Sequence, residues 1–159
     1  MKPFVNLNDI TKYEHKVHGV YQEHYAPISE KIGAQKLGYS VVIVEPGHKV
    51  CPFHNHRVTE EMFLILEGEG LLRFGGEEYA IKTHDIIACP AGGREFAHQI
   101  VNTSDKDIRY LCLSTVDDVD VCEYPDSDKV MSMVGSPQKR DLVHMSRSKD
   151  AVDYFYGEE

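Results

Sequence analysis

Two histidines, two positions apart, are the residues of this 159-residue chain best suited to chemistry. His54 and His56 would point to one face of an extended strand, because side chains alternate along a strand. Glu60 and Glu61 follow within a few residues, and a carboxylate at the start of the next strand can close on the two imidazoles. The stretch therefore predicts a metal half-site, with either Glu60 or Glu61 as its carboxylate.

A third imidazole can complete this set. In the segment 96–102 (FAHQIVN), alternation puts His98 on the face of Phe96, Ile100 and Asn102. A lone inward histidine is more often a satisfied core residue than a ligand, but a barrel would bring its strand beside the segment that carries His54 and His56. Three imidazoles and one carboxylate suit one divalent transition metal ion (Mn, Fe, Ni, Co, Cu or Zn) and suit Ca²⁺ or Mg²⁺ poorly.

Short β-branched and apolar runs, separated by turn residues, must position these side chains. The expected strands are Leu37–Glu45, Val50–His56, Glu61–Leu66, Gly70–Phe74, Glu78–Ile81, Asp85–Cys89, Phe96–Asn102 and Asp107–Thr115. Turns every eight to twelve residues, without an amphipathic helix between them, indicate an antiparallel sandwich or barrel.

One domain is expected from the length of the chain. Residues 1–36 are mixed and polar and are expected to form an N-terminal arm with one or two short strands. Residues 37–117 carry the regular strand pattern and form the barrel core. Residues 118–159 turn acidic and irregular, and are expected to form a C-terminal tail that packs on the barrel and lays three aromatic residues on its body.

The net charge of −9 and the sequence pI near 5.4 disfavour a nucleic-acid partner, since an acidic surface repels phosphates. The longest apolar runs are of strand length, so no membrane span is expected. The first 30 residues lack an apolar signal core, which predicts a cytoplasmic location. The four cysteines show no Cys-x-x-Cys spacing and are interpreted as reduced thiols in or near the core.

The two halves of this pattern resemble the motifs of the cupin family. The first motif has a glycine, a spacer, His-x-His, a glutamate and a glycine, and the matching residues are Gly47, His54, His56, Glu61 and Gly68. The second has Pro-x-Gly, a histidine and an asparagine, and the matching residues are Pro90, Gly92, His98 and Asn102. The resemblance covers about residues 37–116. It implies an all-β, cupin-type double-stranded jelly-roll β-barrel, with an N-terminal arm and an irregular C-terminal tail.

The resemblance also implies a metal at the barrel mouth, bound by His54, His56, Glu61 and His98. The six-residue count to Gly68 favours Glu61 over Glu60, and so does the strand parity that Glu61 shares with Phe63 and Ile65. Three departures fall in predicted turns. The spacer before His54 is one residue longer than usual, His84 replaces a glycine, and five residues instead of two separate Gly92 from His98. Changes in the length or sequence of a turn cost little free energy of folding.

We expect a metal-dependent enzyme acting on a small polar metabolite, a sugar or a carboxylic acid, as an isomerase, epimerase, decarboxylase or dioxygenase. The alternative is a non-catalytic cupin that binds or senses a small molecule. The sequence identifies no catalytic residue. Arg94, Glu60 and Tyr110 are candidates for substrate binding. A homodimer is expected, because open strand edges need cover and the polar arm could supply it in the partner.

Overall fold

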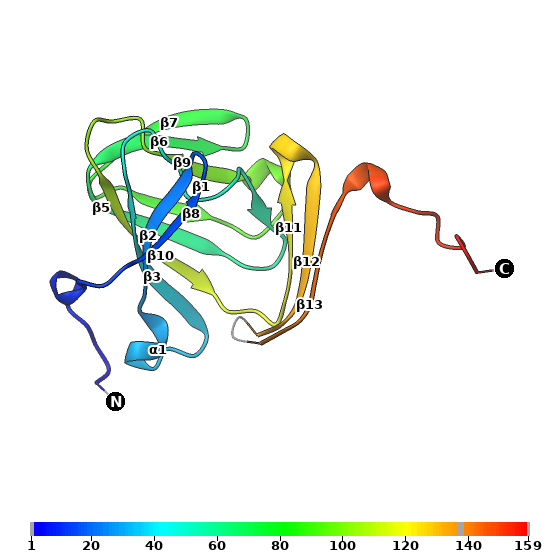
Figure 1. Cartoon of the computed structure of the whole chain (residues 1–159), viewed down its shortest axis with the longest axis horizontal. Coiled ribbons are helices and arrows are strands. Elements are labelled where there is room, and N and C mark those ends of the chain that lie inside the picture. Colours follow the sequence, from blue (N-terminus) through cyan, green and yellow to red (C-terminus); the bar gives the residue numbers. More distant parts are fainter. Residues whose placement is uncertain (1, 137–138, 159) are drawn as a thin grey trace.

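The computed structural model describes residues 2–136 and 139–158 (Figure 1). The first seven strands are β1 (Glu14–His18), β2 (Tyr21–Pro27), β3 (Leu37–Val44), β4 (Asn55–His56), β5 (Glu61–Glu67), β6 (Glu69–Phe74) and β7 (Glu77–Lys82). They are followed by β8 (Ile86–Cys89), β9 (His98–Val101), β10 (Ile108–Thr115), β11 (Val119–Tyr124), β12 (Lys129–Ser136) and β13 (Lys139–Arg147). The α-helix α1 spans only Ser29–Ile32, and no helix in the described ranges is long and apolar enough to cross a bilayer.

Three antiparallel sheets form the barrel. The largest sheet has the order β1-β2-β3-β10-β5-β8, and two smaller sheets have the orders β13-β12-β11-β4 and β7-β6-β9. Strand β10 lies between β3 and β5, although at least 40 residues separate it from either along the chain. The paired strands run antiparallel, so the all-β jelly-roll architecture expected from the sequence is confirmed.

The core lies between these sheets, and strand alternation selects its residues. In β5, Phe63 and Ile65 are buried, whereas the intervening Leu64 and Leu66 keep partial exposure. Val44 and Ile108 are fully buried beside Ile65. Phe63 and Ile65 share the parity of Glu61, so the same alternation that fills the core points Glu61 inward at the start of β5.

The N-terminal segment extends the protein's own largest sheet. β1 and β2 form a hairpin across Gly19, and β2 pairs with β3 over four residues. The short strands expected in this arm are therefore present, and β1 lies at the sheet edge.

The C-terminal segment is more regular than the irregular tail expected from the sequence. β11 pairs with β12 on one side and with β4 on the other, and β12 pairs with β13. After Arg147 the chain leaves the barrel as an extended arm, seen in orange and red in Figure 1. Its aromatic residues Tyr154, Phe155 and Tyr156 are exposed instead of lying on the barrel.

The strand expected over Val50–His56 is also shorter than predicted, because only Asn55–His56 pairs as β4. Pro52 has no N–H to donate to a ladder. The chain instead buries Phe53 and turns its Pro52 carbonyl toward the ring of His54.

Candidate metal centre

Four backbone pairings bring the predicted site residues together. His54 and His98 form an isolated antiparallel bridge, with N···O distances of 3.2 and 2.8 Å in the two directions. His56 lies in β4 and is held by Cys122 of β11. Glu61 begins β5 and lies opposite Ser114 of β10 and Cys89 of β8. The site therefore lies where segments far apart in the sequence meet.

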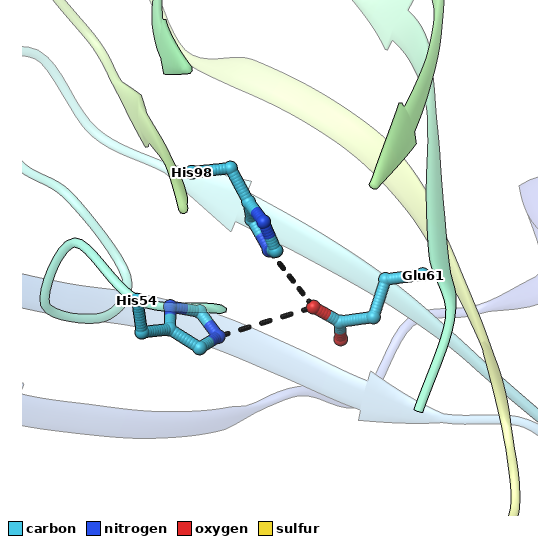
Figure 2. Close-up of side chains that lie close together, drawn as sticks. All are labelled: His54, Glu61 and His98. Atoms are coloured by element: carbon cyan, nitrogen blue, oxygen red, sulfur yellow. Dashed lines mark hydrogen bonds and ion pairs between the residues drawn. The ribbon is translucent and has the colours of Figure 1, made fainter. Parts of the chain in front are cut away.

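The side chains converge on one point. Oε2 of Glu61 lies 3.0 Å from Nε2 of His98, 3.4 Å from Nε2 of His56 and 3.9 Å from Nε2 of His54. The Nε2 atoms of His54 and His56 are 3.1 Å apart. Figure 2 shows the side chains of His54 and His98 directed at the carboxylate of Glu61. The side chains of the four residues are largely buried, with exposures between 4% and 16%.

The opposite nitrogen of each ring has its own acceptor. Nδ1 of His54 lies 2.9 Å from the carbonyl oxygen of Pro52, and Nδ1 of His98 lies 3.1 Å from that of Phe96. Nδ1 of His56 lies 2.5 Å from Oδ2 of Asp120. A neutral imidazole carries one hydrogen, and a carbonyl or carboxylate beside Nδ1 fixes the hydrogen there. Each Nε2 can then present a lone pair to the centre of the cluster.

The protonation equilibria of these groups are strongly shifted. Burial is the main factor for His54 and lowers its pKa to about 4, which keeps this ring neutral. Burial also disfavours charge on His56, but its hydrogen bonds with Asp120, Cys122 and Glu61 outweigh burial and raise the pKa of His56 to about 12. For Glu61, burial is outweighed by hydrogen bonds from His56 and His98, which hold its pKa well below the usual range. The cluster thus combines an anionic carboxylate with a neutral and a strongly basic imidazole.

This donor set fits a divalent transition metal. Three imidazole nitrogens and a carboxylate oxygen, aimed at one another at 3.0–3.9 Å, are the ligand types that such ions take. Without a cation, the proton held by His56 offsets one of the two negative charges of Glu61 and Asp120. A metal ion could take that role by displacing the proton from Nε2. His54, Glu61 and His98 each offer a ligand atom within 4.8 Å of the others, and so do His56, Asp120 and Cys122.

A cavity of about 650 Å³ adjoins the cluster on the side of His56 and Glu61. This volume is typical of a small-molecule site. Many of its walls carry hydroxyl or amide groups, from Ser29, Gln35, Tyr39, Ser40, Thr59, Ser114 and Thr115. Its described lining includes a single cationic side chain apart from histidine, that of Arg140. The cavity could therefore admit a small polar molecule to the cluster.

The other three residues singled out in the sequence lie elsewhere. Glu60 is exposed, and its backbone N–H donates to Oγ1 of Thr115. Arg94 forms ion pairs with Glu123 at 3.3 Å and Asp128 at 3.4 Å. Tyr110 is 3% exposed and packs edge-on against Phe63 in the core. The described lining of the cavity includes none of these three side chains.

Two residues that touch the site were missed by the sequence reasoning. Asp120 contacts Nδ1 of His56, and Sγ of Cys122 lies 3.2 Å from the same atom. Asp120 also accepts a hydrogen bond from the backbone N–H of Val58 at 3.0 Å, which fixes the loop after His56. The alternation in the segment 119–122 (VDVC) places both side chains on one face of a strand, and this was the signal that could have revealed them.

Comparisons with known proteins agree with this fold. Residues 40–114 match the family model for the cupin domain. An uncharacterized protein of Methanocaldococcus jannaschii is 33% identical over 79 residues, which are 50% of this chain. The match spans only 60% of the length of that relative.

Two crystal structures are similar over nearly the whole chain. A proposed sugar phosphate isomerase from Acidithiobacillus ferrooxidans has a TM-score of 0.83 at 23% identity, with 96% of each chain covered. A sugar phosphate isomerase of the cupin superfamily from Silicibacter pomeroyi has a TM-score of 0.76 at 22% identity, with 94% of this chain and 95% of that one covered. Identities this low establish the shared fold alone.

Proposed function

Because this chain is a cupin-domain protein, we propose that it is a metal-dependent enzyme that binds one divalent transition metal ion and acts on a small polar metabolite. His54, His56, Glu61 and His98 are the proposed ligands. The observation that carries this proposal is the convergence of three Nε2 atoms on Oε2 of Glu61, while each Nδ1 is occupied by a separate acceptor.

When bound, a divalent ion in this site would supply Lewis acidity to a carbonyl, hydroxyl or carboxylate oxygen of a substrate. Residues of the chain orient the metal ligands and bind the substrate. Asp120 orients the ring of His56, and the carbonyls of Pro52 and Phe96 orient His54 and His98. The hydroxyl-rich wall of the cavity can bind the polar groups of a substrate. His54 and His98 are 9% and 3% exposed, so little water reaches these two rings.

Sugars and small carboxylic acids are the substrates to screen first. The cavity offers hydroxyl groups from β3 and β10 and one guanidinium from Arg140 at its β13 wall. The sugar phosphate isomerase descriptions belong to the two similar structures, and we extend them to this chain only as a proposal. Isomerisation or epimerisation of a sugar and decarboxylation of a small acid all use a polarised oxygen beside the metal.

A second function, small-molecule binding without catalysis, is favoured by one specific observation. Asp120, the carboxylate nearest to His56 in the cavity wall, is already engaged by His56 and by the N–H groups of Val58 and Val121. Among the described residues, Glu61 is then the remaining carboxylate at the cluster that could accept a proton. Glu30 and Asp117 also line the cavity, but neither belongs to the cluster. A cluster whose own carboxylates are engaged in this way suits binding as well as catalysis.

Metal analysis of protein purified without a polyhistidine tag tests the metal site. One equivalent of a transition metal per chain is expected, and it should be lost in His98→Ala. The control is His24→Ala, which removes a partly exposed histidine that pairs with Glu45. No metal in the purified protein and no uptake on titration would overturn the proposal, and so would full occupancy in His98→Ala.

A turnover screen with each reconstituted metal then separates the enzyme from the binder. Turnover of a sugar or a carboxylic acid that stops on metal removal supports the enzyme. Calorimetric binding of such a molecule without turnover supports the alternative.

A further inference from the structure

Strand β13 combines an open edge with exposed apolar side chains. It ends its sheet in the order β13-β12-β11-β4, so its outer backbone groups have no strand partner within the described ranges. Leu142, Val143 and Met145 are 51%, 57% and 48% exposed. Val143 and Met145 lie opposite Met133 and Met131 on one face, and Leu142 lies opposite Val134 on the other. Charged residues lie at both ends of β13, Lys139, Arg140 and Asp141 at one end and Arg147 at the other. The apolar middle of the strand is the part of this edge that is open to pairing.

Strand β1, at the edge of the largest sheet, has no comparable apolar stretch. β1 presents Glu14, His15, Lys16 and His18 around a single valine, Val17. Charged residues, and lysine in particular, protect such an edge from pairing. The polar arm that the sequence analysis expected to cover a partner is thus the less suitable surface for contact between two copies.

An apolar arm continues from β13. Figure 1 shows residues after Arg147 extending away from the barrel. Tyr154, Phe155 and Tyr156 on this arm are 86%, 72% and 75% exposed. An aromatic side chain carries roughly 150–250 Å² of surface, so these three present about 450 Å² to solvent. Together with the exposed residues of β13, this approaches the roughly 800 Å² per partner of a standard protein interface.

We propose that β13 pairs antiparallel with β13 of a second copy of this chain, and that the 148–158 arm lies on the partner. Two-fold pairing requires a strand that is complementary to itself. Centring the pair on His144 places Val143 of one copy opposite Met145 of the other, and Asp141 opposite Arg147. This register matches Val143 with Met145 and negative with positive at both ends, and it places Leu142 opposite Ser146. Within one copy, Arg147 also pairs with Asp150. Centring it on Val143 would instead place Lys139 opposite Arg147.

The proposed pairing of β13 with a second copy involves a hairpin that lines the cavity. Met133 of β12 and Arg140 of β13 belong to its wall. Arg140 is held by the carbonyl oxygen of Gly135, within the same hairpin. A partner strand along β13 therefore restrains the hairpin that carries one side of the cavity.

Light scattering of the purified full chain tests the proposal. The chain mass is 18.1 kDa, so the dimer should have twice that mass at about 20 µM. Val143→Lys should shift the protein to the monomer. Val17→Lys, a matched change at a 59% exposed valine of β1, should leave the dimer intact. Circular dichroism and metal uptake, unchanged in both variants, would show that the barrel is folded.

A cysteine on the two-fold axis gives an independent test of register. Directly opposite residues of an antiparallel pair have Cα atoms about 4.5–5.5 Å apart, within disulfide range. His144→Cys should therefore form a disulfide-linked dimer under mild oxidation, and Val17→Cys should not. A monomer in solution, a dimer unaffected by Val143→Lys, or cross-linking through Val17→Cys alone would overturn the proposal. None of these outcomes depends on whether the metal site is loaded.

Discussion

Oδ2 of Asp120 lies 2.5 Å from Nδ1 of His56, although 64 positions separate the two residues. The contact joins the C-terminal strand β11 to the short strand β4 and sets the orientation of one proposed metal ligand. Carboxylates in this position raise the basicity of the ligand and fix its tautomer. Asp120 is 2% exposed, so water competes little for the contact.

Replacing this carboxylate should weaken metal binding without removing it. We expect Asp120→Asn to lower metal affinity by about 10–100-fold, because the ring of His56 loses its anionic partner. Competition with a chelator of known affinity measures the change. Asp126→Asn is the control, since Asp126 pairs with Arg73 and is half exposed. Equal affinities in Asp120→Asn and the wild type would show that Asp120 does not position the ligand.

The choice between the two adjacent glutamates can be tested directly. Oε2 of Glu61 reaches all three imidazoles, whereas Glu60 is exposed on the other face of the chain. Glu61→Gln should reduce metal affinity by at least about tenfold, since the amide loses the ligand charge. Glu60→Gln should leave affinity unchanged. Metal titrations followed by calorimetry compare the two variants, and the reverse result would reassign the ligand.

Stability of the metal-free protein should fall in mildly alkaline solution. The pKa of His56 is raised to about 12 from 6.5. A base with a raised pKa contributes its full stabilisation below the unfolded value, and that contribution is lost as the pH rises toward the folded value. Between about pH 7 and 9 the free energy of unfolding should fall by up to about 1.4 kcal/mol per pH unit.

Urea unfolding after treatment with a chelator measures this dependence. The metal-loaded protein should lack the decline, because the ion replaces the proton on Nε2. Asp120→Asn should flatten the slope in the metal-free form. Stability that rises from about pH 7 to 9 in the chelated wild type would contradict the protonated state assigned to His56.

Filling the cavity should separate ligand binding from metal binding. Ala34 lies in the cavity wall after α1, and a larger side chain there would occupy the space. We expect Ala34→Trp to weaken binding of a small-molecule ligand by at least about tenfold while one metal ion remains bound. Ala80→Trp on the exposed face of β7 is the matched control. Unchanged ligand affinity in Ala34→Trp would place the ligand elsewhere.

The barrel core should be far more sensitive to truncation than its surface. Ile65 is fully buried, whereas Ile86 is 71% exposed. Ile65→Ala should lower the free energy of unfolding by about 2–5 kcal/mol, because it removes buried surface and leaves a cavity. Ile86→Ala should change it by less than about 0.5 kcal/mol. Denaturant titrations of both variants measure the difference, and similar losses would contradict the core described here.

Much of the barrel could be predicted from local pattern. The strands from Leu37 to Thr115 follow runs of alternating or β-branched residues, and turn residues separate them. The prediction was wrong where pairing depends on distant segments. In the segment Val50–His56, which contains Pro52, only Asn55–His56 pairs as a strand. The C-terminal segment, which was expected to be irregular, forms β11, β12 and β13. Sheet pairing is a long-range property, so a weak local pattern can still become a strand when a partner edge is present.

The sequence by itself determined which residues could act as ligands. The i, i+2 spacing of His54 and His56 fixes a common face, and the parity of Glu61 with Phe63 and Ile65 turns its carboxylate inward. Only the tertiary structure decided what surrounds those ligands. It brings Asp120 and Cys122 to His56 through the pairing of β11 with β4, and it opens the cavity on the side of Glu61. Alternation along a strand is local and can be read from spacing, whereas the choice of neighbouring strand depends on closure of the whole barrel.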